Sequence, residues 1–110
     1  MTKAVEFQRM RSAGRSWAHP FAVLVAMPND LDHLRLGFAV SKRVGSAVVR
    51  NRVRRRIREI IRLRQHDLTP GFDLLFIARQ PSATVTWVAL RGAIEGLLRR
   101  AHLLTRTDRA

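Results

Sequence analysis

The 110 residues suit one domain spanning 1–110, and a hydrophobic share of 46% excludes a disordered basic tail. Twenty-one lysines and arginines against eight carboxylates give a net charge of +13, which predicts a polyanionic partner. Nucleic acid ranks ahead of an anionic membrane surface because nearly all the basic residues are arginine, whose planar fork binds phosphate and stacks on bases. The absence of cysteine excludes disulfides, thiolate metal sites and thiol nucleophiles, and we expect a cytoplasmic protein.

The first half of the chain predicts one helix and two strands. Thr2 is a candidate N-cap of a short helix that carries Phe7 and ends before Gly14. Apolar residues alternate over 21–27, which predicts a strand that ends at the following Pro-Asn-Asp turn. Residues 34–41 alternate more regularly still and predict a second strand.

In the second half the period changes to that of a helix. Ser46 is a candidate N-cap, and the helix is expected to run to about Gln65 with one apolar face, formed by Val49, Val53, Ile57, Ile60 and Ile61. The apolar run 72–78 predicts a buried strand, and a last helix is expected to be capped near Thr84 or Thr86. The order helix-strands-helix-strand-helix predicts an α/β or α+β sandwich with a single central sheet of about four strands.

The helix that follows Ser46 concentrates the positive charge. On a helical wheel, a polar cluster lies opposite the apolar stripe; it consists of Asn51, Arg54, Arg55, Arg58 and Arg62. Arg52 lies at the shoulder of this cluster, and Arg56 at the edge of the apolar stripe, where its charge would extend outward from the rim of the core. Only Glu59 offsets the repulsion between arginines, so a polyanion is expected to do so; a solvated basic face is the alternative.

Lys42 and Arg43 precede this helix, and Gly45 permits a tight turn between them and the helix start. Together with the free amides of the first helical turn they form a candidate phosphate site. Helix starts with a nearby lysine are common, so an ordinary turn stays open as the alternative.

No catalytic or metal-binding residue is predicted. The four histidines and eight carboxylates show no ligand spacing and no acid–base pair. From the residues alone, three functions stay open: a structural ribosomal protein, a DNA-binding module and a self-sufficient nuclease.

The segment 37–59, GFAVSKRVGSAVVRNRVRRRIRE, resembles the signature of the ribonuclease P protein family. The matching residues are Ser41, Lys42, Arg43, Val44, Gly45, Ala47, Val48, Arg50, Asn51, Arg52, Arg54, Arg55, Ile57, Arg58 and Glu59. Weaker similarities at 6–9, 14–16 and 73–79 extend the resemblance over nearly the whole chain.

This resemblance implies a left-handed βαβ crossover, where the general rule would predict a right-handed one. It also implies the protein subunit of a ribonucleoprotein endoribonuclease, which binds a catalytic RNA and the 5′ leader of precursor tRNA. Hydrolysis would be carried by Mg²⁺ on the RNA, with no cofactor on protein side chains, no obligate protein partner and no membrane. The implied contacts to the RNA subunit are Arg50, Asn51, Arg52, Arg54, Arg55, Arg58 and Arg62, and those to the leader are Phe7, Arg11, Lys42 and Arg43.

Three positions depart from the family pattern. Arg11 and Val25 stand where the family has aromatic residues, which reduces the flat surfaces on which leader bases would stack. Arg56 stands where the family is commonly apolar.

Overall fold

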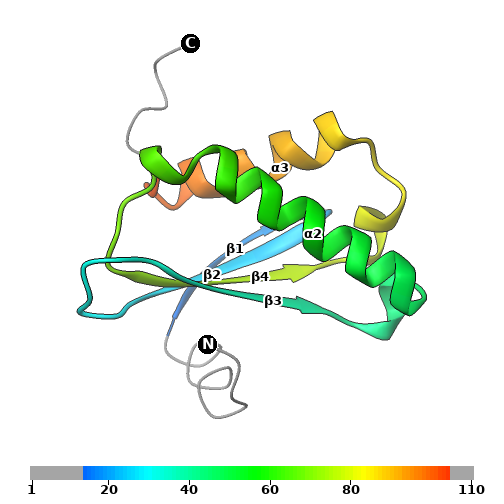
Figure 1. Ribbon diagram of the computed structural model, residues 1–110, viewed down its shortest axis with the longest axis horizontal. Helices are drawn as coiled ribbons and strands as arrows, with labels where there is room; N and C mark the ends of the chain where they lie inside the picture. Colours follow the sequence, from blue (N-terminus) through cyan, green and yellow to red (C-terminus); the bar gives the residue numbers. More distant parts are fainter. Residues whose placement is uncertain (1–13, 105–110) are drawn as a thin grey trace.

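Four strands form one sheet in the computed structural model, which describes residues 14–104 (Figure 1). They are β1 (Arg15–His19), β2 (Ala22–Pro28), β3 (Arg35–Val40) and β4 (Phe72–Ala78), in the spatial order β1-β2-β4-β3. β2 pairs antiparallel with β1 and β4, whereas β3 lies parallel to β4. The strands predicted near 21–27, 34–41 and 72–78 are therefore confirmed, each within about one residue.

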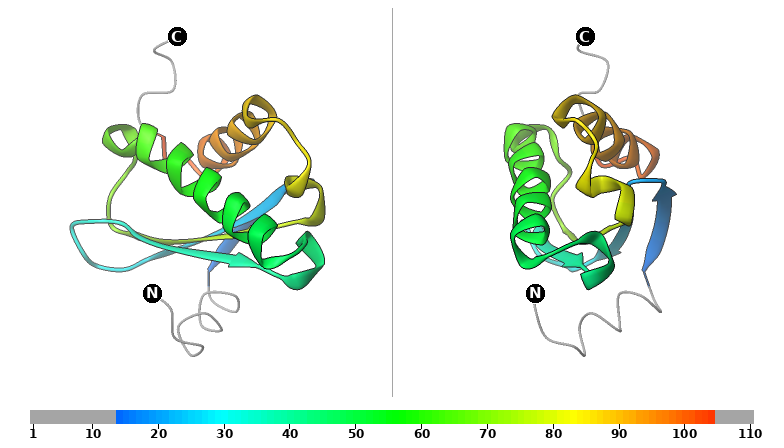
Figure 2. Two further views of the ribbon diagram at one scale, coloured as in Figure 1. Left: turned by 45° about the vertical axis from the view of Figure 1, so that its right-hand side comes forward. Right: turned by 90° about the vertical axis from the view of Figure 1, so that its right-hand side faces the viewer.

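Two helices cover one face of this sheet (Figures 1 and 2). They are α2 (Ala47–Leu63) and α3 (Trp87–Arg100), and α2 connects the parallel strands β3 and β4 in a βαβ unit. The hand of this crossover stays a prediction. The mixed α and β architecture with a single sheet is as expected from the sequence, while the opening helix predicted from Thr2 lies outside the described residues.

Both helices begin directly after an N-cap residue whose hydroxyl accepts a hydrogen bond from a free amide of the first turn. The Ser46 Oγ accepts a hydrogen bond from the Val49 amide at 3.3 Å, and the Thr86 Oγ1 accepts one from the Ala89 amide at 3.1 Å. Gly45 has a φ of 156°, and a Cβ there would lie 2.8 Å from the Val49 Cγ1, so the turn into α2 requires glycine. α2 ends at Leu63, slightly before the expected end, because a 3₁₀ turn, η2 (Gln65–Asp67), follows it.

The core lies between the sheet and the two helices. Leu24, Phe76, Ile57 and Ile94 are fully buried there, and Leu36, Phe38 and Val40 of β3 pack against this core. A smaller apolar cluster occupies the other face of the sheet, around Val25, Leu75 and their half-buried neighbours Val23, Met27, Ala39 and Ile77. The alternation over 21–27 thus predicted the strand, but its Val23–Val25–Met27 face belongs to the second cluster.

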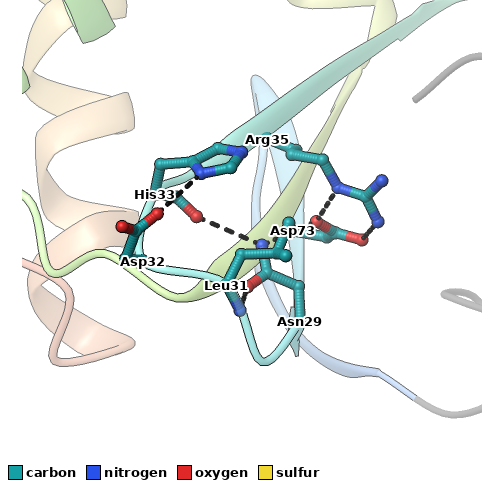
Figure 3. A network of polar contacts seen from close by, with 6 residues as sticks. All are labelled: Asn29, Leu31, Asp32, His33, Arg35 and Asp73. Atoms are coloured by element: carbon teal, nitrogen blue, oxygen red, sulfur yellow. Dashed lines mark hydrogen bonds and ion pairs between the residues drawn. The ribbon is translucent and has the colours of Figure 1, made fainter.

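A polar network fixes one end of the β3–β4 pair (Figure 3). Asp73, only 2% exposed, accepts hydrogen bonds from the Arg35 Nε at 2.8 Å, the Arg35 Nη2 at 2.7 Å and the Asn29 Nδ2 at 3.0 Å. These contacts, Arg35's first, hold the pKa of Asp73 below its ordinary value. The loop side of the network joins Asn29 to the Leu31 amide and the His33 carbonyl, so a buried carboxylate connects the loop to both strands.

Candidate nucleic-acid interface

The face of α2 that carries the core residues is the one predicted. Val53, Ile57 and Ile60 are 0% exposed, and Ile61 is 3% exposed. The side chains of Asn51, Arg52, Arg55, Arg58 and Arg62 are exposed, while those of Arg50, Arg54 and Arg56 are half-buried. α2 therefore places its apolar side chains toward the core and most of its basic side chains toward solvent, an arrangement suited to binding RNA.

Carboxylates do not neutralise the centre of this helix. Among the described residues, the ion pairs of α2 and its C-cap involve only Arg62, with Glu59, and Arg64, with Asp67 and Glu95. None of the arginines from 50 to 58 pairs with a carboxylate in the part of the chain that the structure describes. The field of this segment is thus open to an external polyanion.

On one side of α2, neighbouring groups orient the exposed polar residues. The Arg54 Nη1 donates to the Asn51 Oδ1 at 2.7 Å. The Arg58 guanidinium lies 5.4 Å from the ring centre of Phe38 on β3, in a cation–π contact, and Phe38 in turn stacks on Phe76. An oriented guanidinium loses less side-chain freedom when it binds phosphate, which favours affinity.

On the other side, two arginines turn toward the protein itself. The Arg52 Nη2 donates to the Ala83 carbonyl at 3.1 Å, and the Arg56 Nη1 donates to the Val85 carbonyl at 3.1 Å. Arg56 is half-buried, in agreement with its predicted place at the rim of the core. The sequence predicted no partner within the protein for either side chain.

Arg62, at the far end of α2, already has a strong partner. Its Nη2 and Nε donate to the two carboxylate oxygens of Glu59 at 2.6 and 2.9 Å. These hydrogen bonds lower the pKa of Glu59 and raise that of Arg62. Both side chains are solvated, so a phosphate competes with Glu59 for the Arg62 fork rather than meeting a free cation.

Lys42 and Arg43 lie on a 3₁₀ turn, η1 (Lys42–Val44), directly after β3, and both are exposed. Arg43 borders a shallow groove of about 680 Å³ at the carboxyl ends of β3 and β4. The other sides of this strand-end groove are formed by Ser41, by the segment 78–81 and by the β1–β2 turn, residues 18–20. Lys42 is not among its lining residues.

The strand-end groove contains two basic or polar side chains that sequence reasoning missed, Arg79 and His19. The His19 Nδ1 accepts a hydrogen bond from the Phe21 amide at 3.0 Å. Ligands of open α/β sheets bind beyond the carboxyl ends of the strands. Because Arg79 directly follows the parallel strand β4, this rule would have found it, whereas His19 ends the antiparallel strand β1 and carried no such signal.

The remaining predicted site residues fall elsewhere. Phe7 and Arg11 lie outside the described residues. Val25 is 4% exposed and lies in the apolar cluster on the second face of the sheet, whose described members are aliphatic or methionine. In the described range 14–104, His, Cys, Asp and Glu form no group of three suited to a metal ion, and no helix is long and apolar enough to cross a membrane.

Comparison with known proteins identifies a family for this arrangement. Residues 1–102 match the family model described as Ribonuclease P. The Ribonuclease P protein component of Roseiflexus castenholzii is 45% identical over 100 residues, which cover 90% of this chain and 82% of that protein. That of Caldanaerobacter subterraneus is 39% identical over 109 residues, covering 99% and 94% of the two chains.

Two solved structures share the fold. The RNase P protein of Staphylococcus aureus superposes with a TM-score of 0.88 at 34% identity, covering 94% of this chain and 95% of that one. The RNase P protein of Thermotoga maritima superposes with a TM-score of 0.84 at 28% identity, covering 91% and 94%.

Proposed function

The chain belongs to the ribonuclease P protein family, and we propose from this that it binds a catalytic RNA subunit and the 5′ leader of precursor tRNA, assisting removal of the leader. The hydrolytic step, in this proposal, belongs to Mg²⁺ held by the RNA, and the protein contributes affinity. The observation that carries the proposal is the stretch of α2 from Arg50 to Arg58, whose arginines have no carboxylate partner among the described residues. A surface of this kind binds RNA by releasing counterions from phosphates.

The structure supports a division of work between two surfaces. The outward side of α2, with Arg54, Arg55 and Arg58 at its centre, is suited to the folded RNA subunit, because a rigid helix presents its charges at fixed spacing. Arg43 on η1 lines the strand-end groove, which is open and also bordered by Arg79, and Lys42 precedes Arg43 on the same turn. Such a groove suits a single strand, and here the leader would run.

Reconstitution tests the proposal. The protein, mixed with a bacterial ribonuclease P RNA at low Mg²⁺ concentration, is expected to increase the rate of 5′-leader removal from precursor tRNA, whereas the protein alone cleaves nothing. Arg55→Ala should weaken assembly with the RNA, and Arg99→Ala on α3 is the charge-matched control. If the protein alone cleaved precursor tRNA, the self-sufficient nuclease would replace this proposal.

A structural ribosomal protein remains the alternative function, and no observation favours it. Purification of the tagged protein with its bound RNA distinguishes the two. Recovery of one abundant structured RNA together with precursor tRNA supports the proposal, and recovery of ribosomal RNA alone contradicts it. The same preparation tests the expected absence of an obligate protein partner, since such a partner would be recovered in fixed proportion with the protein.

A further inference from the structure

Two arginines of α2 bind the β4–α3 connection, whose first residues line the strand-end groove. Arg52 and Arg56 lie one helical turn apart and donate to the carbonyls of Ala83 and Val85, each at 3.1 Å. Both carbonyls belong to the connection between β4 and α3, which includes the 3₁₀ turn η3 (Gln80–Ala83). The two guanidiniums thus attach α2 to a segment some thirty residues farther along the chain.

The internal hydrogen bonds of this connection fix its shape. Ser82 is 0% exposed, and its Oγ and amide both donate to the Arg79 carbonyl, at 2.7 and 2.9 Å. The Arg79 amide donates to the Phe21 carbonyl at 2.9 Å, which anchors the start of the segment to the turn that precedes β2. The end nearer α3, from Ala83 to Val85, is anchored to α2 by the two arginines.

η3 and the Arg79 residue that precedes it help to form the groove, and η3 lies against η1. Arg79, Gln80 and Pro81 line the groove together with Ser41 and Arg43. A single-stranded polyanion must meet Arg79 and Arg43 together to gain from both charges, so a displaced η3 would weaken its binding. A side chain that fixes η3 can therefore act on RNA that it does not touch.

We propose that Arg56 is a positioning residue for the leader: by holding the Val85 carbonyl it keeps η3 at the distance from η1 at which Arg79 and Arg43 engage the same strand of RNA. This inference rests on the proposed function, since it assigns the groove to the leader. Arg56 is suited to the role because it is half-buried and turned away from the outward face of α2. Arg52, which is exposed, contributes a second, weaker bond of the same kind.

The test compares the affinity of the reconstituted holoenzyme for precursor tRNA with its affinity for mature tRNA, which lacks the leader. Arg56→Leu removes the donor but preserves apolar packing, and it is expected to lower the precursor-to-mature affinity ratio roughly three- to tenfold. Arg56→Gln, which is too short to reach Val85, should give the same loss. Arg56→Lys retains a donor on a long chain and should restore most of the ratio.

Two controls separate positioning from charge and from stability. Arg99→Ala removes one positive charge elsewhere and should leave the ratio unchanged. Binding of the RNA subunit and of mature tRNA should stay at wild-type level in every Arg56 variant. Hydrogen exchange in Arg56→Leu should rise at residues 80–86, while α2 and the sheet keep their protection.

Three outcomes overturn the inference. If Arg56→Leu weakens assembly with the RNA subunit as much as Arg55→Ala does, Arg56 is a direct RNA contact. If the ratio stays at the wild-type value in Arg56→Leu or, should that variant not fold, in Arg56→Gln, the residue has only a structural role. If the wild-type holoenzyme itself binds precursor and mature tRNA equally, the leader role of the proposed function fails first, and the inference fails with it.

Discussion

Replacing Asp73 by asparagine removes one charge from the network at the start of β4 and preserves the shape of the side chain. Both carboxylate oxygens of Asp73 act as acceptors. Oδ1 accepts hydrogen bonds from the Asn29 Nδ2 and the Arg35 Nε, and Oδ2 accepts one from the Arg35 Nη2. An asparagine NH₂ must therefore face another donor in either orientation. The substitution loses charge-assisted bonds and introduces one repulsive contact.

The size of the effect follows from burial. The Asp73 side chain is 3% exposed but that of Arg35 is 38% exposed. In the variant, the Arg35 guanidinium can therefore form hydrogen bonds with water in place of the lost carboxylate. The cost should consequently fall below the roughly 3–5 kcal/mol of a fully buried pair, at about 2 kcal/mol of unfolding free energy. For a chain of this length that corresponds to a fall of roughly 8–16 °C in Tm.

The pH dependence gives a second, independent check. Because the pKa of Asp73 is depressed in the folded state, its stabilisation is complete above the ordinary carboxylate pKa of about 3.9 and is lost as pH falls through the folded value. The difference in stability between wild type and Asp73→Asn should therefore be full at neutral pH and shrink in increasingly acid solution below about pH 4. The variant should bind RNA normally wherever it is folded.

Urea unfolding followed by circular dichroism, at neutral pH and in steps into acid, measures both quantities. Asp32→Asn is the control, since the Asp32 side chain is fully exposed and its partner His33 is solvated; its midpoint should match that of wild type. A neutral-pH stability of Asp73→Asn within about 0.5 kcal/mol of wild type would refute the assignment, because surface substitutions cause changes of that size. If the stability difference between wild type and Asp73→Asn were as large in acid as at neutral pH, the argument from the depressed pKa of Asp73 would be refuted.

Three further predictions concern α2. Arg55→Ala should leave the Tm unchanged and reduce the salt slope of RNA binding by about one, as measured by titrations over a range of salt; an unchanged slope would remove the outward face from the interface. Ile57→Ala, at a site that is 0% exposed, should cost roughly 2–5 kcal/mol in chemical unfolding, and a neutral result would mean that the helix is wrongly faced. Glu59→Gln should tighten RNA binding in the same titrations because it releases the Arg62 fork, whereas weaker binding would show that the pair itself is recognised.

Local patterns predicted the elements whose burial follows a strict period. α2 has a 3.6-residue apolar repeat on one face and charge on the other, so the sequence predicted both the extent of the helix and the face that it turns to the core. β1 was missed because Arg-Ser-Trp-Ala-His contains one large apolar residue and no alternation. Its strand conformation comes from backbone pairing with β2 and from Trp17 packing on the core, which are long-range effects.

In the candidate site, too, local patterns predict some features and long-range packing decides the others. The exposure of Arg55 and Arg58 follows from the helical period alone, whereas the partners of Arg52 and Arg56 lie on a different element and depend on how the β4–α3 connection folds back. The strand-end groove is likewise a product of topology, since it forms where the parallel strands β3 and β4 end side by side.

The arginines of α2 therefore should not be counted as equal phosphate contacts. Arg52 and Arg56 donate to protein carbonyls, and Arg62 is held by Glu59, so each must give up or share an existing bond to meet RNA. Arg54 and Arg58 are oriented by Asn51 and Phe38 without being neutralised. Salt dependence counts neutralised phosphates rather than basic residues, so the α2 surface should show a smaller slope than its composition suggests. In the proposed interface, the guanidiniums without a carboxylate partner are the ones expected to meet phosphate, while the other arginines help to fix the structure that presents them.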